Sequence, residues 1–166
     1  MCHSGGYFKA QAGYDLGRNT MSQTKYPLPN DLKMRCLSLV RGYDRMVLEY
    51  HKERNEIIYS TPKPPDGQPK GNAVGDSCYN KTELLNKLDK KFDTDAMRAV
   101  EQAKLHIGLD LASEEERRRL TNAIWDSCVE GRNFIFEYRA LNMGKTNFYE
   151  RRRKFLYEIA ECLQFV

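Results

Sequence analysis

The sequence lacks any apolar run that approaches the roughly 20 residues needed to cross a bilayer, so we expect no membrane partner. Its first twenty residues also lack the basic region and following apolar run of a secretory signal. They show no periodicity, which indicates a disordered leader or an upstream-start artefact. With the residues before the first proline included, we assign this disordered leader to residues 1–26.

The cysteines show no regular spacing. None of the five cysteines forms a CxxC pair, and their odd number argues against a disulfide framework. Cys36 and Cys162 fall at apolar positions of predicted helices, so we expect both to be small buried thiols. This usage indicates a reduced protein, and we predict a cytoplasmic location.

Catalytic signatures are equally scarce. The three histidines (His3, His51 and His106) lie in separate segments, and none sits beside another metal ligand at a suitable spacing. No phosphate-cradling glycine loop or nucleophile elbow is present. We therefore expect neither an enzyme nor a cofactor or metal site, with His106 as an ordinary surface or boundary residue.

Strand patterns are missing too, and helical periodicity predicts an all-α fold. After Asn30, a good N-cap, a heptad-like stripe indicates one long amphipathic helix through Leu32, Cys36, Leu39, Tyr43, Met46, Tyr50 and Ile57. A second stripe, from Leu85 to Ile107, predicts another long helix, and prolines and glycines predict a loop over residues 61–80. Residues 27–112 are therefore expected to form a long antiparallel helical hairpin, or dimerising helices.

Residues 113–166 predict a further helical domain. Ser113 and Glu116 form a capping box, and Gly131 suits the residue after a helix, so one helix should run to about Glu130. A short apolar helix is expected at Asn133–Leu141. After a turn, Thr146 can cap a last helix.

Basic residues gather in two runs that differ in their neighbours. Arg117, Arg118 and Arg119 each have a glutamate three positions earlier, which predicts a solvated, ion-paired face. Residues 132–156 carry seven basic and two acidic side chains, a local excess of five positive charges. Such an excess is typical of a compact basic patch that binds nucleic acid.

The last helix can be divided by placing its residues at about 3.6 per turn. Phe148 and Phe155 then lie on the core side, whereas Asn147 and Arg151 face outward one turn apart. Arg151 has no acidic residue three or four positions away, so we predict it to be unpaired. Arg152 falls toward the core side, where we expect it to snorkel or to meet a carboxylate of another helix.

An outward Asn and Arg at the start of a helix suit adenine and guanine edges in the major groove. Lys145, Thr146 and the helix N-terminus could hold phosphate oxygens. The predicted DNA-binding residues are Lys145, Thr146, Asn147, Glu150, Arg151, Arg153, Lys154, Arg132 and Arg139.

The segment LNMGKTNFY at residues 141–149, followed by a basic helix ending in EIAECLQFV, resembles a known motif. It is similar to the C-terminal helix-turn-helix of phage late-operon transcriptional regulators of the RinA/ArpU type, which itself resembles region four of sigma factors. The resemblance covers residues 113–166. It implies recognition-helix positions for Thr146, Asn147 and Arg151, and core positions for Leu141, Phe148 and Phe155.

Two functions stay open at this point. The first is a phage-derived, sequence-specific regulator of transcription that binds double-stranded DNA as a homodimer and reads the major groove with the helix starting near Thr146. RNA polymerase is a further candidate partner of such a regulator. The second is a helical protein-interaction or phage-assembly module without specific DNA binding.

Overall fold

The protein is all-α, as the sequence predicts. The computed structural model describes residues 25–60, 77–133, 141 and 143–166. Within these residues there are five helices and no strand. The helices are α1 (Asn30–Tyr59), α2 (Ser77–Asp89), α3 (Phe92–Leu105), α4 (Glu114–Val129) and α5 (Lys145–Cys162). None of the described helices is long and apolar enough to cross a membrane.

The first predicted helix is confirmed as one continuous element, α1, which has 30 residues. Its stripe is buried at Cys36 and Met46 and half-buried at Tyr43. The predicted N-cap is wrong by one residue, because Pro29 occupies that position and Asn30 is already helical. Proline holds φ at −53° there, and its carbonyl accepts the first bond, from the N–H of Lys33 at 2.9 Å.

The second predicted long helix is instead two helices, α2 and α3, separated by a turn at Lys90 and Lys91. The N–H groups of both lysines reach back only three residues, and the Thr94 hydroxyl donates to the Leu88 carbonyl at 2.9 Å. These bonds satisfy the Lys87 and Leu88 carbonyls at the end of α2. The predicted loop over residues 61–80 is also too long, since α2 begins at Ser77; residues 61–76 lie outside the described part.

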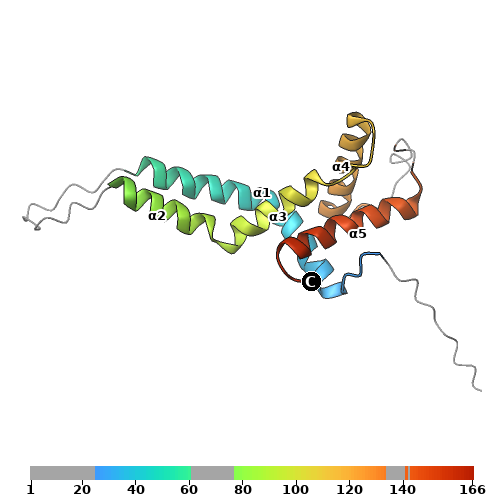
Figure 1. The fold of residues 1–166 in the computed structure, drawn as a ribbon, viewed down its shortest axis with the longest axis horizontal. Helices are drawn as coiled ribbons and strands as arrows, with labels where there is room; N and C mark the ends of the chain where they lie inside the picture. Colours follow the sequence, from blue (N-terminus) through green and yellow to red (C-terminus); the bar gives the residue numbers. More distant parts are fainter. Residues whose placement is uncertain (1–24, 61–76, 134–140, 142) are drawn as a thin grey trace, which may run out of the picture.

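Helix α2 runs antiparallel to the C-terminal half of α1. Tyr50 donates to Asp89 at 3.1 Å near one end of the pair, and the Lys81 ammonium donates to the Ile58 carbonyl at 2.8 Å near the other. Figure 1 shows these two helices projecting together from the rest of the molecule. We call α2 and residues 47–59 of α1 the helical arm.

The main core lies where α3, α4 and α5 meet the N-terminal half of α1 (Figure 1). Helix α3 contacts both α1 and α5, so it ties the two ends of the chain together. The largest side chains buried there are Phe148, Phe155, Leu120, Ile124, Leu156 and Ile159. A smaller cluster of Met46, Ala96 and Met97 joins this core to the helical arm.

Helix α4 follows its predicted boundaries closely. The Ser113 hydroxyl accepts a hydrogen bond from the N–H of Glu116 at 3.4 Å, and Gly131 adopts the positive φ of 71° that glycine tolerates best. Leu120, Ile124 and Cys128 are buried on one face of the helix.

Helix α5 buries Phe148 and Phe155 as predicted, but its start and end differ from the prediction. Gly144 is the N-cap, and Thr146 is an exposed residue of the first turn that makes no capping bond. Cys162 is exposed rather than buried, because the end of α5 borders an open space beside Phe92 and Arg98 of α3. The short helix predicted before α5 falls almost wholly outside the described residues.

The leader predicted at residues 1–26 includes two residues, Lys25 and Tyr26, that the structure describes. Residues 1–24 lie outside the described part, but Tyr26 is half-buried and packs against Tyr157 of α5 with ring centroids 5.7 Å apart. The segment before α1 therefore already packs against α5 at Tyr26.

Candidate nucleic-acid interface

The first turn of α5 is the most open part of the candidate interface. Lys145, Thr146 and Asn147 are all exposed, while Phe148 between them and the next turn anchors the helix in the core. The turn contains no acidic residue, and among the described residues no side chain caps its backbone N–H groups. The partial positive charge of the helix N-terminus therefore faces solvent beside the Lys145 ammonium.

Arg151 is not unpaired, contrary to the prediction. Its Nη1 and Nη2 donate to the two carboxylate oxygens of Asp110 at 2.7 and 2.5 Å, and its Nε donates to Oδ1 of Asn147 at 3.0 Å. Asp110 belongs to the connection between α3 and α4, 41 residues away in sequence. Local spacing along α5 gives no sign of such a distant carboxylate.

This contact has clear electrostatic consequences. The hydrogen bonds from Arg151 lower the pKa of Asp110 to about 2, and the bond to Asp110 raises the pKa of Arg151. Both groups are therefore fully charged near neutral pH. The two side chains proposed to read bases, Asn147 and Arg151, are occupied by each other and by Asp110.

Arg152 lies toward the interior as predicted, but it meets a thiol instead of a carboxylate. Its Nε donates to the Cys128 sulfur at 3.4 Å, while the Nε of Arg41 donates to the Cys128 carbonyl at 3.2 Å. Burial raises the pKa of the Cys128 thiol, and the nearby Arg152 and Arg41 oppose this shift. The contact brings α1, α4 and α5 together at one point.

The other predicted site residues divide into three groups. Lys154 pairs with Glu158 at 3.4 Å, and Arg132 pairs with its near neighbour Glu130. Glu150 and Arg153 are exposed on α5, and within the described residues Arg153 and Lys145 make no ion pair. Arg139 lies outside the described part of the chain.

The expected ion-paired face of α4 is only partly present. Arg119 pairs with Glu115, four positions earlier, rather than with Glu116. Arg117 instead donates to the Leu105 carbonyl at 2.7 Å and so closes the end of α3. His106, expected to be a surface or boundary residue, lies on the surface, with Nδ1 at 3.5 Å from a carboxylate oxygen of Glu158.

Three residues that the sequence reading did not single out help to build this region. Asp110 binds Arg151, Arg41 binds the end of α4, and Lys33 of α1 lies near Arg152 and Arg153. All three come from segments far from α5, so no spacing rule could have found them. No group of three or more potential metal ligands gathers among the described residues.

Comparison with family models, with curated proteins and with solved structures yields no match to this chain. The assignment of function therefore depends on the residues themselves.

Proposed function

We propose that the protein binds double-stranded DNA through the exposed first turn of α5, and that it acts as a regulator of transcription. The observation that carries this proposal is the first turn of α5, where Lys145, Thr146 and Asn147 are exposed together. The turn has no acidic residue, and no side chain among the described residues caps its N–H groups. A helix N-terminus of this kind suits a phosphate group, since both the free N–H groups and the helix dipole attract negative charge.

The charges around this turn suit the phosphate backbone better than the base edges. Lys145 and Arg153 are exposed and make no ion pair in the part of the chain that the structure describes. Arg151, by contrast, is held by Asp110 and is only 21 % exposed in its side chain. Backbone contacts position a protein on DNA, whereas base contacts specify the sequence.

Base reading by Asn147 and Arg151 would require an exchange of partners. A guanine edge offers Arg151 two acceptors in place of the two carboxylate oxygens of Asp110. Sequence-specific binding, as the resemblance to phage late-operon regulators implies, therefore includes release of Asp110 as one of its steps.

Salt dependence of binding tests the DNA-binding proposal. We expect the association constant for a fluorescent duplex to fall linearly with salt concentration on a double-logarithmic plot, with a slope of about −0.9 for each phosphate contacted. Lys145→Ala and Arg153→Ala should each reduce the slope by about one contact. Arg118→Ala, on the exposed face of α4, is the matched control and should leave the slope unchanged.

Two results would count against this function. One is an absence of duplex binding at about 50 mM salt, where backbone contacts are strongest. The other is an equal effect of all three substitutions, which would indicate that DNA is attracted by the overall positive charge of the protein and not by a defined interface. Selection from a random duplex pool then tests specificity, because a sequence-specific regulator enriches a common site.

The helical arm supports a second candidate function, a helical protein-interaction module. Leu48 and Tyr79 are 70 % and 68 % exposed, and Leu88 is the one buried residue between Cys78 and Asp89. An arm with so little of its apolar surface covered suits contact with another helix, which a second copy of this chain would provide.

Light scattering at micromolar concentration tests this second candidate. We expect a dimer, and Leu48→Asp should shift the mass toward the monomer. Leu109→Asp is the matched control, because Leu109 is also exposed but lies outside the arm. A monomeric mass for the unmodified protein would rule out a dimer formed through the arm.

A further inference from the structure

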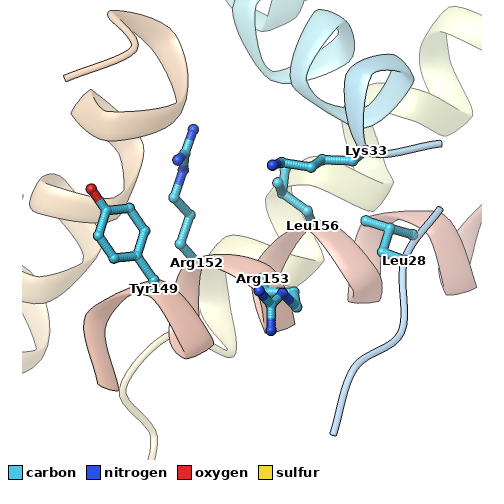
Figure 2. A pocket seen from close by; sticks show the side chains of 6 residues that line it. All are labelled: Leu28, Lys33, Tyr149, Arg152, Arg153 and Leu156. Carbon is cyan, nitrogen blue, oxygen red and sulfur yellow. The ribbon is translucent and has the colours of Figure 1, made fainter. Parts of the chain in front are cut away.

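A small pocket lies between the start of α1 and the middle of α5 (Figure 2). Its volume is about 150 Å³, and it is lined by Leu28, Lys33, Tyr149, Arg152, Arg153 and Leu156. Three of these side chains are positively charged and none is acidic. We call this the α1–α5 pocket.

The pocket gathers three positively charged side chains with no acidic residue in its lining. Several other cations of the described residues instead meet carboxylates, as in the pairs Arg98–Asp89 and Lys91–Glu53. Within the described residues, neither Lys33, Arg152 nor Arg153 makes an ion pair. Three like charges around one hollow repel one another, so an anion placed among them would be attracted by all three.

The position of Arg152 is fixed before any ligand arrives. Its Nε is held by the Cys128 sulfur, and the side chain is half-buried. Its two terminal nitrogens make no hydrogen bond to another described residue and stay available to a ligand. Figure 2 shows Arg152 extending from α5 and Lys33 extending from α1 into the space between the two helices. A donor held in this way loses little conformational entropy on binding.

The shape and chemistry of the pocket favour a terminal phosphate. Arginine and lysine are the side chains suited to phosphate oxygens, and a phosphomonoester carries a charge of about −1.5 to −2 at pH 7. The half-buried Leu28 supplies apolar surface for the group that carries the phosphate. A group at the end of a molecule can enter a hollow, whereas the phosphates of a duplex lie along a continuous backbone.

We propose that the α1–α5 pocket binds a phosphomonoester, carried either by a free nucleotide or by the 5′ end of a nucleic-acid strand. This binding site lies apart from the first turn of α5 and does not require duplex binding, although it shares Arg153 with the proposed duplex interface. It requires Lys33 and Arg153 as charge partners and Arg152 as a fixed donor.

Calorimetric titration of the full chain with AMP, and with adenosine as the ligand without phosphate, tests the proposal. AMP should bind saturably and adenosine should not. Lys33→Gln and Arg153→Gln should each weaken AMP binding by about tenfold or more, as expected for the loss of one charge-assisted contact. Arg118→Gln is the control, because Arg118 is exposed on α4 and does not line the pocket. Arg152 is not substituted in these experiments, because its loss would also break the contact with Cys128.

Competition identifies which molecule carries the phosphate. A 5′-phosphorylated single-stranded oligonucleotide that displaces AMP, when its 5′-hydroxyl counterpart does not, assigns the pocket to strand ends. Failure of both oligonucleotides to displace AMP assigns it to free nucleotides. Either result supports the pocket, provided that Lys33→Gln weakens AMP binding.

The proposal is overturned if AMP gives no saturable heat up to about 5 mM, a range that would detect even a Kd of about 1 mM. It is also overturned if Lys33→Gln and Arg153→Gln bind AMP as well as the unmodified protein does. Lys145→Ala separates this site from the proposed duplex interface, because it should weaken duplex binding and leave AMP binding intact.

Discussion

Replacement of Asp110 by asparagine removes the charge that holds Arg151 while keeping the shape of the side chain. The pair has two hydrogen bonds, at 2.7 and 2.5 Å, and the bidentate geometry is the favourable one for arginine and carboxylate. We expect Asp110→Asn to change both the stability of the protein and its affinity for DNA.

The magnitude of the stability change follows from exposure. A pKa of about 2 for Asp110, against 3.8 for an ordinary aspartate, would correspond to more than 2 kcal/mol if solvent did not screen the pair. The Asp110 side chain is 61 % exposed, so screening reduces the expected loss of unfolding free energy to about 0.5–1 kcal/mol at pH 7. Urea denaturation measures this difference.

The pH dependence gives an independent measure of the same contact. Because the folded-state pKa is lowered, the contribution of the pair is fully present above the unfolded value of 3.8 and is lost as the pH falls toward about 2. The unmodified protein should therefore lose more stability than Asp110→Asn over this range. Asp44→Asn is the control, since Asp44 is exposed on α1 and makes no ion pair with another described residue.

The effect on DNA binding should have the opposite sign. If the proposed base reading is right, Asp110 and a nucleic acid bind the same guanidinium nitrogens of Arg151, so Asp110→Asn should bind a duplex more tightly than the unmodified protein. Equal stability of the Asp110 and Asp44 variants at pH 7 and at pH 3 would refute the pairing itself. A weaker or unchanged duplex affinity would refute the competition.

Two further predictions concern the core and the cysteines. Phe155 is 1 % exposed among α1, α3 and α4, so Phe155→Ala should lower the unfolding free energy by about 3–5 kcal/mol in urea denaturation, against less than about 1 kcal/mol for the conservative change of half-buried Tyr157 to Phe. If Phe155→Ala shifted the urea midpoint as little as the Tyr157 variant does, the burial of Phe155 in the core would be contradicted. In the native protein, a thiol reagent should modify the exposed Cys78 and Cys162 and spare the buried Cys36 and Cys128. Burial also raises the pKa of Cys36 to about 11, which keeps its thiol protonated at neutral pH. Mass spectrometry of the native protein checks this, and early modification of Cys36 would contradict the packing of α1.

Local sequence signals were sufficient for most helices of this fold. The capping serine Ser113 and the terminal Gly131 marked both ends of α4, and the apolar stripes identified α1 and the buried face of α5. The turn between α2 and α3 was missed because Leu88 and Phe92 preserve helical spacing across it, although Phe92 is 48 % exposed. Periodicity alone cannot separate a continuous helix from two helices whose stripes stay in register.

The candidate site was only partly accessible to the same reasoning. Exposure of Lys145 and Asn147 could be predicted from their positions on one helix. The partners of Arg151 and Arg152 could not, because Asp110 and Cys128 reach α5 through tertiary packing. Side chains that look free on a helical wheel are available to a ligand only if no distant segment has already bound them.

Helix α1 belongs both to the main core and to the helical arm, so a movement of the arm is transmitted along one continuous helix. At 1.5 Å per residue its 30 residues span about 45 Å, and the pivot point of such a movement lies near Met46, Ala96 and Met97. A tilt of about 10° there would displace the far end of the arm by roughly 3 Å, given the length of helix beyond the pivot point. A molecule that binds the arm and tilts it would therefore also tilt the other end of α1. That end carries Lys33, which lines the α1–α5 pocket.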